Sequence, residues 1–441
     1  MEKDMTARQG LNVCLINDSF PPSIDGVANT VVNYAKIINA GLGKASVVTP
    51  YYPETDDSAY DFDVIRYPSI DTTRLVGYRA GIPFSAESAA RMMEKDFDII
   101  HSHCPVTATM YGRIFRDMTD RPLVLTYHTK FDIDIEKAIR MHLLQEGATR
   151  ILVDNISACD EVWTVSRGAG DNLRKLGYEG DFVVMPNGVD FPRGRLPEDR
   201  VRELTAGYDI PEGVPVFLYV GRMMWYKGLR ITLDALQMLS ETGRDFRMVF
   251  VGGGADKDDV VAYAEAQKLD KVIFVPPTNS REEVRAWCCR ADLFLFPSTF
   301  DTNGLVVREA AACGLASVLI KGSCAAEDSA DGVNSFLINE DPLSMFTKIE
   351  ELLGTPEKLK TVGEEAQRSL YLSWEDSVKN AYDRYGTVLE NYKRGESGRQ
   401  YRVTDLISEM NARTLEDYVN FYRWFNSFTR GIRNNILDVF K

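Results

Sequence analysis

The sequence predicts an α/β protein built from two doubly wound, Rossmann-like domains. Short, nearly continuous apolar runs recur along the 441 residues, and each precedes a polar turn and a helical pattern. Apolar runs without alternation are typical of strands that helices cover on both faces, as in a parallel sheet. The runs form two series, separated by a polar segment rich in Pro and Gly, so we expect two such domains.

The first series of expected strands lies before residue 190. Its members share β-branched and apolar residues, which favour strands. They are Asn12–Ile16, Ala45–Thr49, Val64–Tyr67, Asp98–His103, Leu123–His128, Glu161–Val165 and Phe182–Met185. The Asn187-Gly188 pair then interrupts the pattern. Because Asn-Gly tolerates a positive φ, we expect it to bend the chain between the domains.

The second series follows the polar segment 191–214. Its expected strands are Val214–Val220, Arg247–Val251, Val272–Val275, Leu293–Phe296, Ser317–Ile320 and Ser335–Ile338. After about Leu370 only helical patterns continue, and we expect these helices to cross back onto the first domain. The expected N-terminal domain is therefore 1–190 with helices 371–441, and the C-terminal domain is 191–370.

Composition narrows the class of protein. The net charge of −14 argues against general binding of nucleic acid, which needs clustered cations. Seven cysteines at irregular spacing indicate reduced thiols and a cytoplasmic protein. The charged N-terminus lacks the apolar core of a signal peptide, and no apolar stretch of about 18 residues predicts a membrane span.

Two loops of the second domain have the composition of an anion site. Gly221-Arg222 ends the first strand of that domain, and Lys227 follows in the loop that opens a helix. Two cations beside the free N–H groups of a helix N-terminus suit a diphosphate, although a solvated loop would have the same composition.

The segment after Phe296 combines a turn, a helix start and two carboxylates. Asp301 lies in the turn, Asn303-Gly304-Leu305 opens a helix, and Glu309 lies within that helix. Ligands of open α/β sheets bind beyond the carboxyl ends of the strands, where backbone N–H groups accept phosphate. Carboxylates there suit the hydroxyl donors of a sugar or a ribose.

This order of motifs resembles the family 4 retaining glycosyltransferases of the two-domain GT-B fold, from about Asn12 to Trp374. The resemblance implies that Arg222 and Lys227 hold the donor phosphates, with Gly221 beside them. It also implies that Glu309 binds the ribose hydroxyls and that Asp301 contacts the sugar ring. Asp301 departs from the family pattern because a glutamate, one carbon longer, is usual there.

The first domain agrees with the resemblance. Its first loop is not a G-x-G-x-x-G fingerprint, which argues against a dehydrogenase. The resemblance places Gly26 near the donor phosphate and Asp25 on the acceptor side. It also implies that His103 points toward the cleft and that His128 binds a hydroxyl of the sugar.

Two features of this domain have alternatives. Asp132 either lines the acceptor side or starts a helix. His128 is either a ligand of the sugar or a structural histidine. His101 and His103 share one strand face, but two imidazoles are an incomplete metal shell, so no metal is expected.

The resemblance implies transfer of a hexose from a nucleotide diphosphate sugar, with retention of configuration and no required cofactor or metal. A UDP-sugar is preferred over a GDP-sugar. The acceptor is either a glycan or a lipid, because the loops are similar to those of bacterial diacylglycerol and phosphatidylinositol glycosyltransferases. A sugar-nucleotide epimerase of the same fold, or a catalytically weakened sugar-nucleotide-binding module, are the alternatives.

Two basic and apolar segments bear on the acceptor. Residues 74–79 add cations near the expected acceptor face. The tail 399–441 alternates aromatic residues, among them Phe421, Trp424 and Phe428, with Arg423 and further arginines. Such a helix either packs on the protein or lies in a membrane interface, at the inner face of the membrane.

Overall fold

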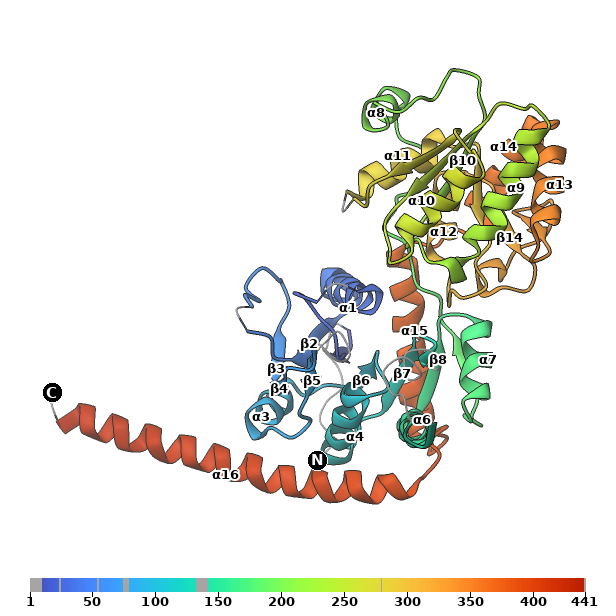
Figure 1. The fold of residues 1–441 in the computed structure, drawn as a ribbon. Helices are drawn as coiled ribbons and strands as arrows, with labels where there is room; N and C mark the ends of the chain where they lie inside the picture. The colour runs from blue at the N-terminus through green and yellow to red at the C-terminus, as the bar shows by residue number, and fades with distance from the viewer. Residues whose placement is uncertain are drawn as a thin grey trace. The chain divides into compact units, whose positions relative to one another are not determined.

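The computed structural model describes residues 10–23, 25–53, 55–73, 79–131, 142–278 and 280–439. The chain divides into two compact units. Unit 1 comprises residues up to 165, 169–186 and 377–441, and unit 2 comprises 166–168 and 187–376. Each unit contains one parallel sheet flanked by helices (Figure 1). The prediction of two Rossmann-like domains is therefore confirmed.

The sheet of unit 1 has seven strands in the order β3-β2-β1-β6-β7-β8-β9. These strands are β1 Asn12–Ile16, β2 Lys44–Pro50, β3 Val64–Tyr67, β6 Ile99–Ser102, β7 Leu123–Tyr127, β8 Glu161–Thr164 and β9 Val183–Val184. A small antiparallel ribbon, β4 (Ser69–Ile70) with β5 (Ala80–Gly81), follows β3 and was not predicted. Its strands are too short for any periodic pattern.

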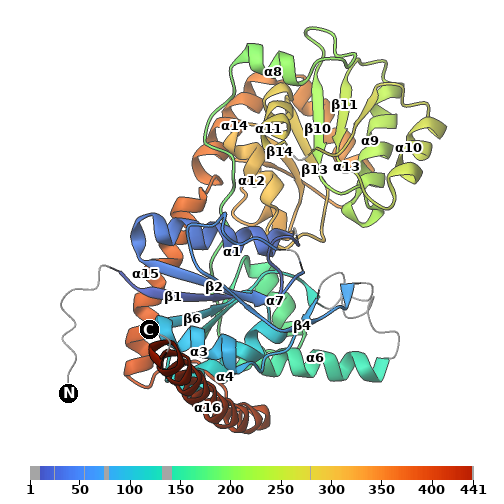
Figure 2. The same ribbon diagram turned by 90° about the vertical axis from the view of Figure 1, so that its left-hand side faces the viewer.

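The helices of unit 1 alternate with its strands, as parallel pairing requires. They are α1 Gly26–Ile37, a π-helical turn η1 Ile38–Leu42, α3 Ala86–Lys95, α4 Thr107–Thr119, α6 His142–Ser157, α7 Arg167–Lys175, α15 Trp374–Lys393 and α16 Val403–Val439. The last two helices confirm the predicted return of the chain onto this unit: α15 places Tyr385 beside His101, and α16 packs on α3 and α4 (Figure 2).

The sheet of unit 2 has six strands in the order β12-β11-β10-β13-β14-β15. They are β10 Val216–Val220, β11 Arg247–Val251, β12 Val272–Val275, β13 Leu293–Phe296, β14 Ser317–Ile320 and β15 Phe336–Ile338. Its helices are α8 Glu198–Leu204, η2 Trp225–Lys227, α9 Leu229–Glu241, α10 Lys257–Ala266, α11 Arg281–Arg290, α12 Leu305–Ala312, η3 Cys324–Ala326, α13 Pro342–Leu353 and α14 Pro356–Ser369.

The junctions of the units differ by a few residues from the expected 190/191 and 370/371. They lie at 186/187 and 376/377, because residues 187–190 pack in unit 2 against the start of α15. Neither Asn187 nor Gly188 has a positive φ, so the chain does not use the tolerance of Asn-Gly for that conformation here. A Cβ at Gly188 would instead collide with the backbone of Trp374, so close approach explains this glycine.

Both sheets have a switch point, where connections leave in opposite directions. In unit 1 it lies between β1 and β6, and in unit 2 between β10 and β13. Loops that follow such a pair of strands diverge and leave a crevice beyond the carboxyl ends. The predicted site residues follow these strands or their neighbours.

Candidate functional site

Glycines shape the loop that follows β10 in unit 2. Gly221 has φ 151° and Gly228 has φ 76°, conformations that side chains with a Cβ rarely adopt. At Gly228 a Cβ would also collide with the carbonyl oxygen of Pro297, at the end of β13. A Cβ at Gly252, after β11, would likewise collide with the carbonyl oxygen of Gly221. The loops after three neighbouring strands therefore pack backbone against backbone.

Lys227 connects the loops on the two sides of the switch point. It ends η2 and is buried, and its Nζ donates to Oδ1 of Asp301 at 2.6 Å. The other oxygen of Asp301 accepts from the hydroxyl of Ser298, which is fully buried after β13. The structure thus brings Lys227 and Asp301 together as an ion pair.

Arg222 differs from Lys227 in its surroundings. Its side chain is exposed, whereas its carbonyl oxygen accepts from the Tyr219 hydroxyl at 3.0 Å. That bond fixes the backbone of the loop and leaves the guanidinium in solvent. The exposed guanidinium of Arg222 is therefore accessible to an anion.

The helix α12 begins at the turn that the sequence singled out. Gly304 is its N-cap with φ 58°, and a Cβ there would collide with Ala325. Leu305 is the first helical residue. The amide nitrogen of the Asn303 side chain is buried, and within the described residues it has no hydrogen-bond partner. Free N–H groups of this kind at a helix N-terminus suit an anion.

Glu309 lies one turn further along α12 and pairs with a residue that sequence reasoning missed. Arg281, at the start of α11, donates to Glu309 Oε1. The Arg281 guanidinium also lies 4.7 Å above the Phe191 ring and 3.6 Å from a carboxylate oxygen of Asp190. Burial raises the pKa of Glu309, and Arg281 opposes that rise.

Nothing local in the sequence marks Arg281. It precedes two glutamates at a helix start, a pattern typical of a solvated surface. Glu309 is the single acidic residue of α12. Its need for a cationic partner was the signal that could have led to Arg281.

Unit 1 brings three histidines together at the ends of β6 and β7. Nδ1 of His103 lies 3.0 Å from Nε2 of His128. His101 bonds through Nδ1 to the Tyr385 hydroxyl at 2.6 Å and through Nε2 to Thr126 at 2.7 Å. The histidines thus use most of their nitrogens on each other or on hydroxyls, which leaves few lone pairs for a metal ion.

Burial keeps these imidazoles neutral. It lowers the pKa of His128 to about 3 and holds the pKa values of His101 and His103 well below the ordinary range. Nε2 of His103 is buried and, among the described residues, has no hydrogen-bond partner. At neutral pH the group is therefore a set of neutral hydrogen-bonding rings.

The loop after β1 contains a buried acid that the sequence analysis did not select. Asp18 accepts from the Ala108 amide at 2.9 Å, near the N-terminus of α4. Burial raises the pKa of Asp18 to about 6, against several hydrogen bonds that lower it. The signal for this residue was its position directly after a strand.

Of the remaining residues expected at the site in unit 1, some are described by the structure and others are not. Asp25 is the N-cap of α1, and its carboxylate accepts from the Val27 and Ala28 amides. Gly26 starts that helix, and a Cβ there would meet nothing within 4 Å. Asp132 and residues 74–78 lie outside the described residues. The structure therefore gives Asp25 a capping role and leaves the expected ligand roles as predictions.

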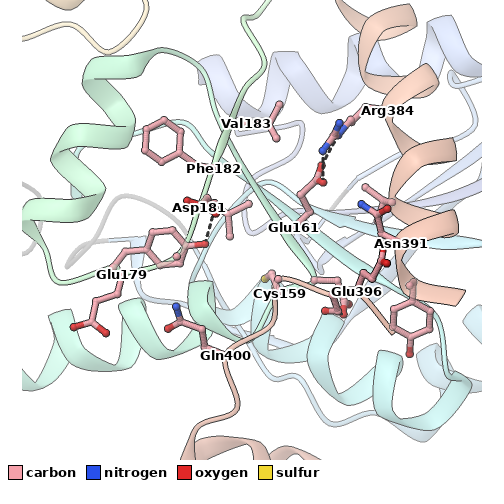
Figure 3. Close-up of a pocket in the computed structure, with 18 residues that line it drawn as sticks. Cys159, Glu161, Glu179, Asp181, Phe182, Val183, Arg384, Asn391, Glu396 and Gln400 are labelled. Atoms are coloured by element: carbon pink, nitrogen blue, oxygen red, sulfur yellow. Dashed lines mark hydrogen bonds and ion pairs between the residues drawn. The ribbon is translucent and has the colours of Figure 1, made fainter. Parts of the chain in front are cut away.

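Each unit has a cavity near the amino ends of its strands, away from the carboxyl ends that the predicted residues follow. In unit 1 a cavity of about 430 Å³ adjoins Glu161, the first residue of β8 (Figure 3). Its wall includes the ion pair between Arg384 and Glu161, 2.7 Å long. In unit 2 a cavity of about 420 Å³ adjoins Pro215, before β10. Neither cavity contains the residues that the sequence selected.

Comparison with known families matches both halves of the chain. Residues 24–193 match the family described as Glycosyltransferase Family 4, and residues 201–369 match Glycosyl transferases group 1. An alpha-monoglucosyldiacylglycerol synthase of Acholeplasma laidlawii is 24% identical over 371 residues, which are 81% of this chain and 92% of that protein. A D-inositol 3-phosphate glycosyltransferase of Nocardia farcinica is 27% identical over 340 residues, covering 72% of this chain and 73% of that protein.

Solved structures share the fold. The HepE protein of Anabaena, crystallised with UDP and glucose, superimposes with a TM-score of 0.63 at 18% identity, over 86% of this chain and 100% of that chain. Sucrose-phosphate synthase of Thermosynechococcus elongatus gives 0.67 at 18% identity, over 86% and 99% of the two chains.

Proposed function

The chain belongs to the family 4 glycosyltransferases, and from this premise we propose that it transfers a hexose from a UDP-sugar to a lipid or glycan acceptor. The observation that carries the proposal is the cluster at the switch point of unit 2. There Lys227, Asp301 and the N-terminus of α12 face the same loops, and Glu309 follows on α12. A cation, N–H groups and carboxylates are what a sugar diphosphate requires.

The preference for UDP-glucose and for a lipid acceptor is part of the proposal. HepE was crystallised with UDP-glucose, and the Acholeplasma relative bears the name of a diacylglycerol glycosylating enzyme. An O-antigen chain mannosyltransferase of Escherichia coli, 29% identical over 336 residues, supports a glycan acceptor as the alternative.

The charges of unit 2 account for the chemical step. When the bond between the sugar carbon and the phosphate oxygen breaks, negative charge grows on the diphosphate. Lys227 and the α12 amides stabilise that charge more in the transition state than in the ground state. Arg222, exposed beside them, adds a second cation. These groups supply the charge that a divalent metal would otherwise contribute, so we propose that no metal is required.

Transfer with retention then needs no protein nucleophile. The acceptor oxygen forms its bond to the sugar carbon on the face that the phosphate leaves, and its proton passes to a phosphate oxygen. His128 is neutral at physiological pH, so its proposed role is a hydrogen bond to a sugar hydroxyl.

Asp301 has a second proposed role because of its contacts. It holds Lys227 at 2.6 Å, so the donor diphosphate has to replace Asp301 as the partner of the ammonium. The released carboxylate is then available to a sugar hydroxyl. Asp301 would then contact the sugar in spite of its shortened side chain.

The test is the Lys227→Ala variant, with Lys360→Ala as the matched control. Lys360 is an exposed lysine of α14 in the same unit. Lys227→Ala is expected to reduce sugar transfer from UDP-glucose by about a hundredfold or more, as the removal of one charge-stabilising donor does. Lys360→Ala is expected to keep full transfer.

Product analysis separates the alternatives. Labelled sugar recovered on the acceptor supports transfer, whereas an epimerised donor without an acceptor product would support the epimerase. Binding of UDP-glucose without any turnover would support the binding module. Normal transfer by Lys227→Ala would contradict the proposed phosphate role.

A further inference from the structure

The long helix α16 packs on unit 1 through one face, as far as its side chains are described. Ala412, Leu415 and Val419 are buried against α3 and α4. Near its start, Asp405 is fully buried and pairs with Arg113 at 3.3 Å and with Arg399 at 2.8 Å. Apolar burial and a buried ion network therefore fix this helix to the body of the unit.

The same helix exposes large apolar side chains on another face. Beyond Val403, the first residue of the helix, seven of them are about half exposed or more, and they are Leu406, Ile407, Met410, Tyr418, Phe421, Trp424 and Phe425. At about 100° per residue, Met410, Phe421 and Phe425 lie roughly opposite the buried Ala412 and Val419. We call these seven residues the outer stripe of α16. The helix is thus apolar toward the body and apolar again away from it.

The outer stripe continues onto the loops of unit 1. The ring of Tyr418 contacts the ring of Phe84 edge to face, with centroids 5.9 Å apart. Phe84 and Ile82 follow β5 and are more than a third exposed, and Ile70 in β4 is 59% exposed. This ribbon comes directly after the carboxyl end of β3. The apolar surface therefore extends from α16 toward the edge of the sheet where His103 and His128 lie.

The charge of the chain changes sign along α16. The whole chain carries a net charge of −14. From residue 418 onward the sequence has four basic residues and one acidic residue, together with aromatic residues such as Phe421 and Trp424. A local basic excess in an acidic protein is complementary to an anionic surface.

We propose that the outer stripe of α16 docks on a bilayer that contains anionic lipid. Helices with Trp, Tyr and Phe on one face and basic residues on the other are typical of the membrane interface. No helix in the described part of the chain has the length and apolarity to span a bilayer, so the contact is peripheral. The partner of the outer stripe is thus a membrane, and the competing partner that the experiment tests is a second copy of the chain.

The experiment is flotation of the full chain with two kinds of vesicle, phosphatidylcholine alone and phosphatidylcholine mixed with phosphatidylglycerol. We expect binding to the anionic vesicles and at least several-fold weaker binding to the neutral ones. The triple variant Phe421→Ser, Trp424→Ser, Phe425→Ser is expected to lose about tenfold or more of the binding, since it removes three interfacial aromatic side chains. The double variant Thr414→Ser, Asn420→Ser changes exposed polar positions of the same helix and is expected to bind normally.

A conservative variant keeps the test valid if the triple variant folds poorly. Trp424→Phe is expected to bind anionic vesicles as the wild type does. Lipids brominated on their chains quench the fluorescence of Trp424 on binding, so the variant is expected to lose most of that quenching. Equal quenching in both proteins would overturn the docking of this helix.

The remaining outcomes also decide the proposal. Absence of flotation by the wild type overturns it, and so does undiminished flotation of the triple variant. A dimer that the triple variant dissociates, with no vesicle binding, would assign the outer stripe to a second copy. Vesicle binding needs no sugar nucleotide, so it is measured apart from the proposed transferase activity, which is followed as release of UDP.

Discussion

The carboxyl edges of the two sheets are built from opposite chemistry. In unit 2 the loops contain glycines with positive φ and charged side chains, and both Lys227 and Glu309 already have a partner of opposite sign. In unit 1 the corresponding edge contains neutral imidazoles and hydroxyls, packed against Tyr34 and Trp163. One edge therefore holds its polar groups as ion pairs, and the other holds them as neutral hydrogen-bonded rings.

The physical reason lies in the cost of burial. A charge that loses water needs a partner, and in unit 2 the carboxylates of Asp301 and Glu309 supply that partner. A neutral imidazole needs only hydrogen bonds, which the histidines supply to one another. Substitutions at the two edges test this contrast.

The largest effect is expected at Gly228. Gly228→Ala places a Cβ against the Pro297 carbonyl at φ 76°, so the loops after β10 and β13 have to separate. We expect a loss of about 3 kcal/mol or more in the unfolding free energy, measured by urea denaturation. Gly243→Ala is the matched control, since Gly243 has φ 79° and open space around its Cβ position. The control is expected to lose only about 1 kcal/mol, and equal losses would refute the close packing of the loops.

A second effect concerns the histidines of unit 1 and pH. The folded pKa of His128 is depressed to about 3, so its contribution to stability is present above the unfolded pKa of about 6.5 and is lost as the pH falls below it. Between pH 6.5 and pH 5 this histidine alone is expected to cost about 2 kcal/mol, and His101 and His103 act in the same direction.

Asp18 opposes this trend, because its folded pKa is raised to about 6. Its contribution is present below its unfolded pKa and is lost as the pH rises through about 6. His128→Gln is therefore expected to flatten the loss of stability toward acid, and Asp18→Asn to steepen it. Urea unfolding at pH 7 and pH 5 measures both slopes. Unchanged slopes in both variants would show that these groups are not buried as described.

The smallest effect is expected at Asp301. Asp301→Asn leaves the buried Lys227 without its counter-charge, with a loss of about 1–2 kcal/mol in the free energy of unfolding because Asp301 is partly exposed. UDP is expected to raise the melting temperature of this variant more than that of the wild type, since the diphosphate then has no competitor for Lys227.

Asp328→Asn serves as the control for this prediction. Asp328 pairs with Arg308 at 3.4 Å and is more than half exposed, so little stability is expected to depend on it. A smaller melting-point rise with UDP in Asp301→Asn than in the wild type would argue against competition for the lysine.

The pattern of apolar runs in the sequence was enough to predict the strands of both sheets. Each long apolar run became a strand within one or two residues, because a strand covered on both faces has to be apolar throughout. The loops after β10 and β13 were also found from sequence, since a strand, a turn and a helix start fix their position on the sheet edge.

Other parts of the site could not be predicted. Tyr385 bonds to His101 across 284 positions of sequence, and Arg281 reaches Glu309 from the next helix. No periodicity links such residues, because their contact depends on how α15 and α11 pack. The exposure of Trp424 could not be predicted either, because the sequence of an aromatic helix does not show whether its outer face is covered.

Local sequence patterns were therefore sufficient to predict the two α/β domains, the loops that carry glycine and charge, and the family of the chain. The tertiary structure alone decided which charges are paired, which imidazoles are neutral and which face of α16 is exposed. The reason is that local propensity and periodicity act over a few residues, whereas ion pairing, desolvation and exposure depend on neighbours that only the folded chain brings together.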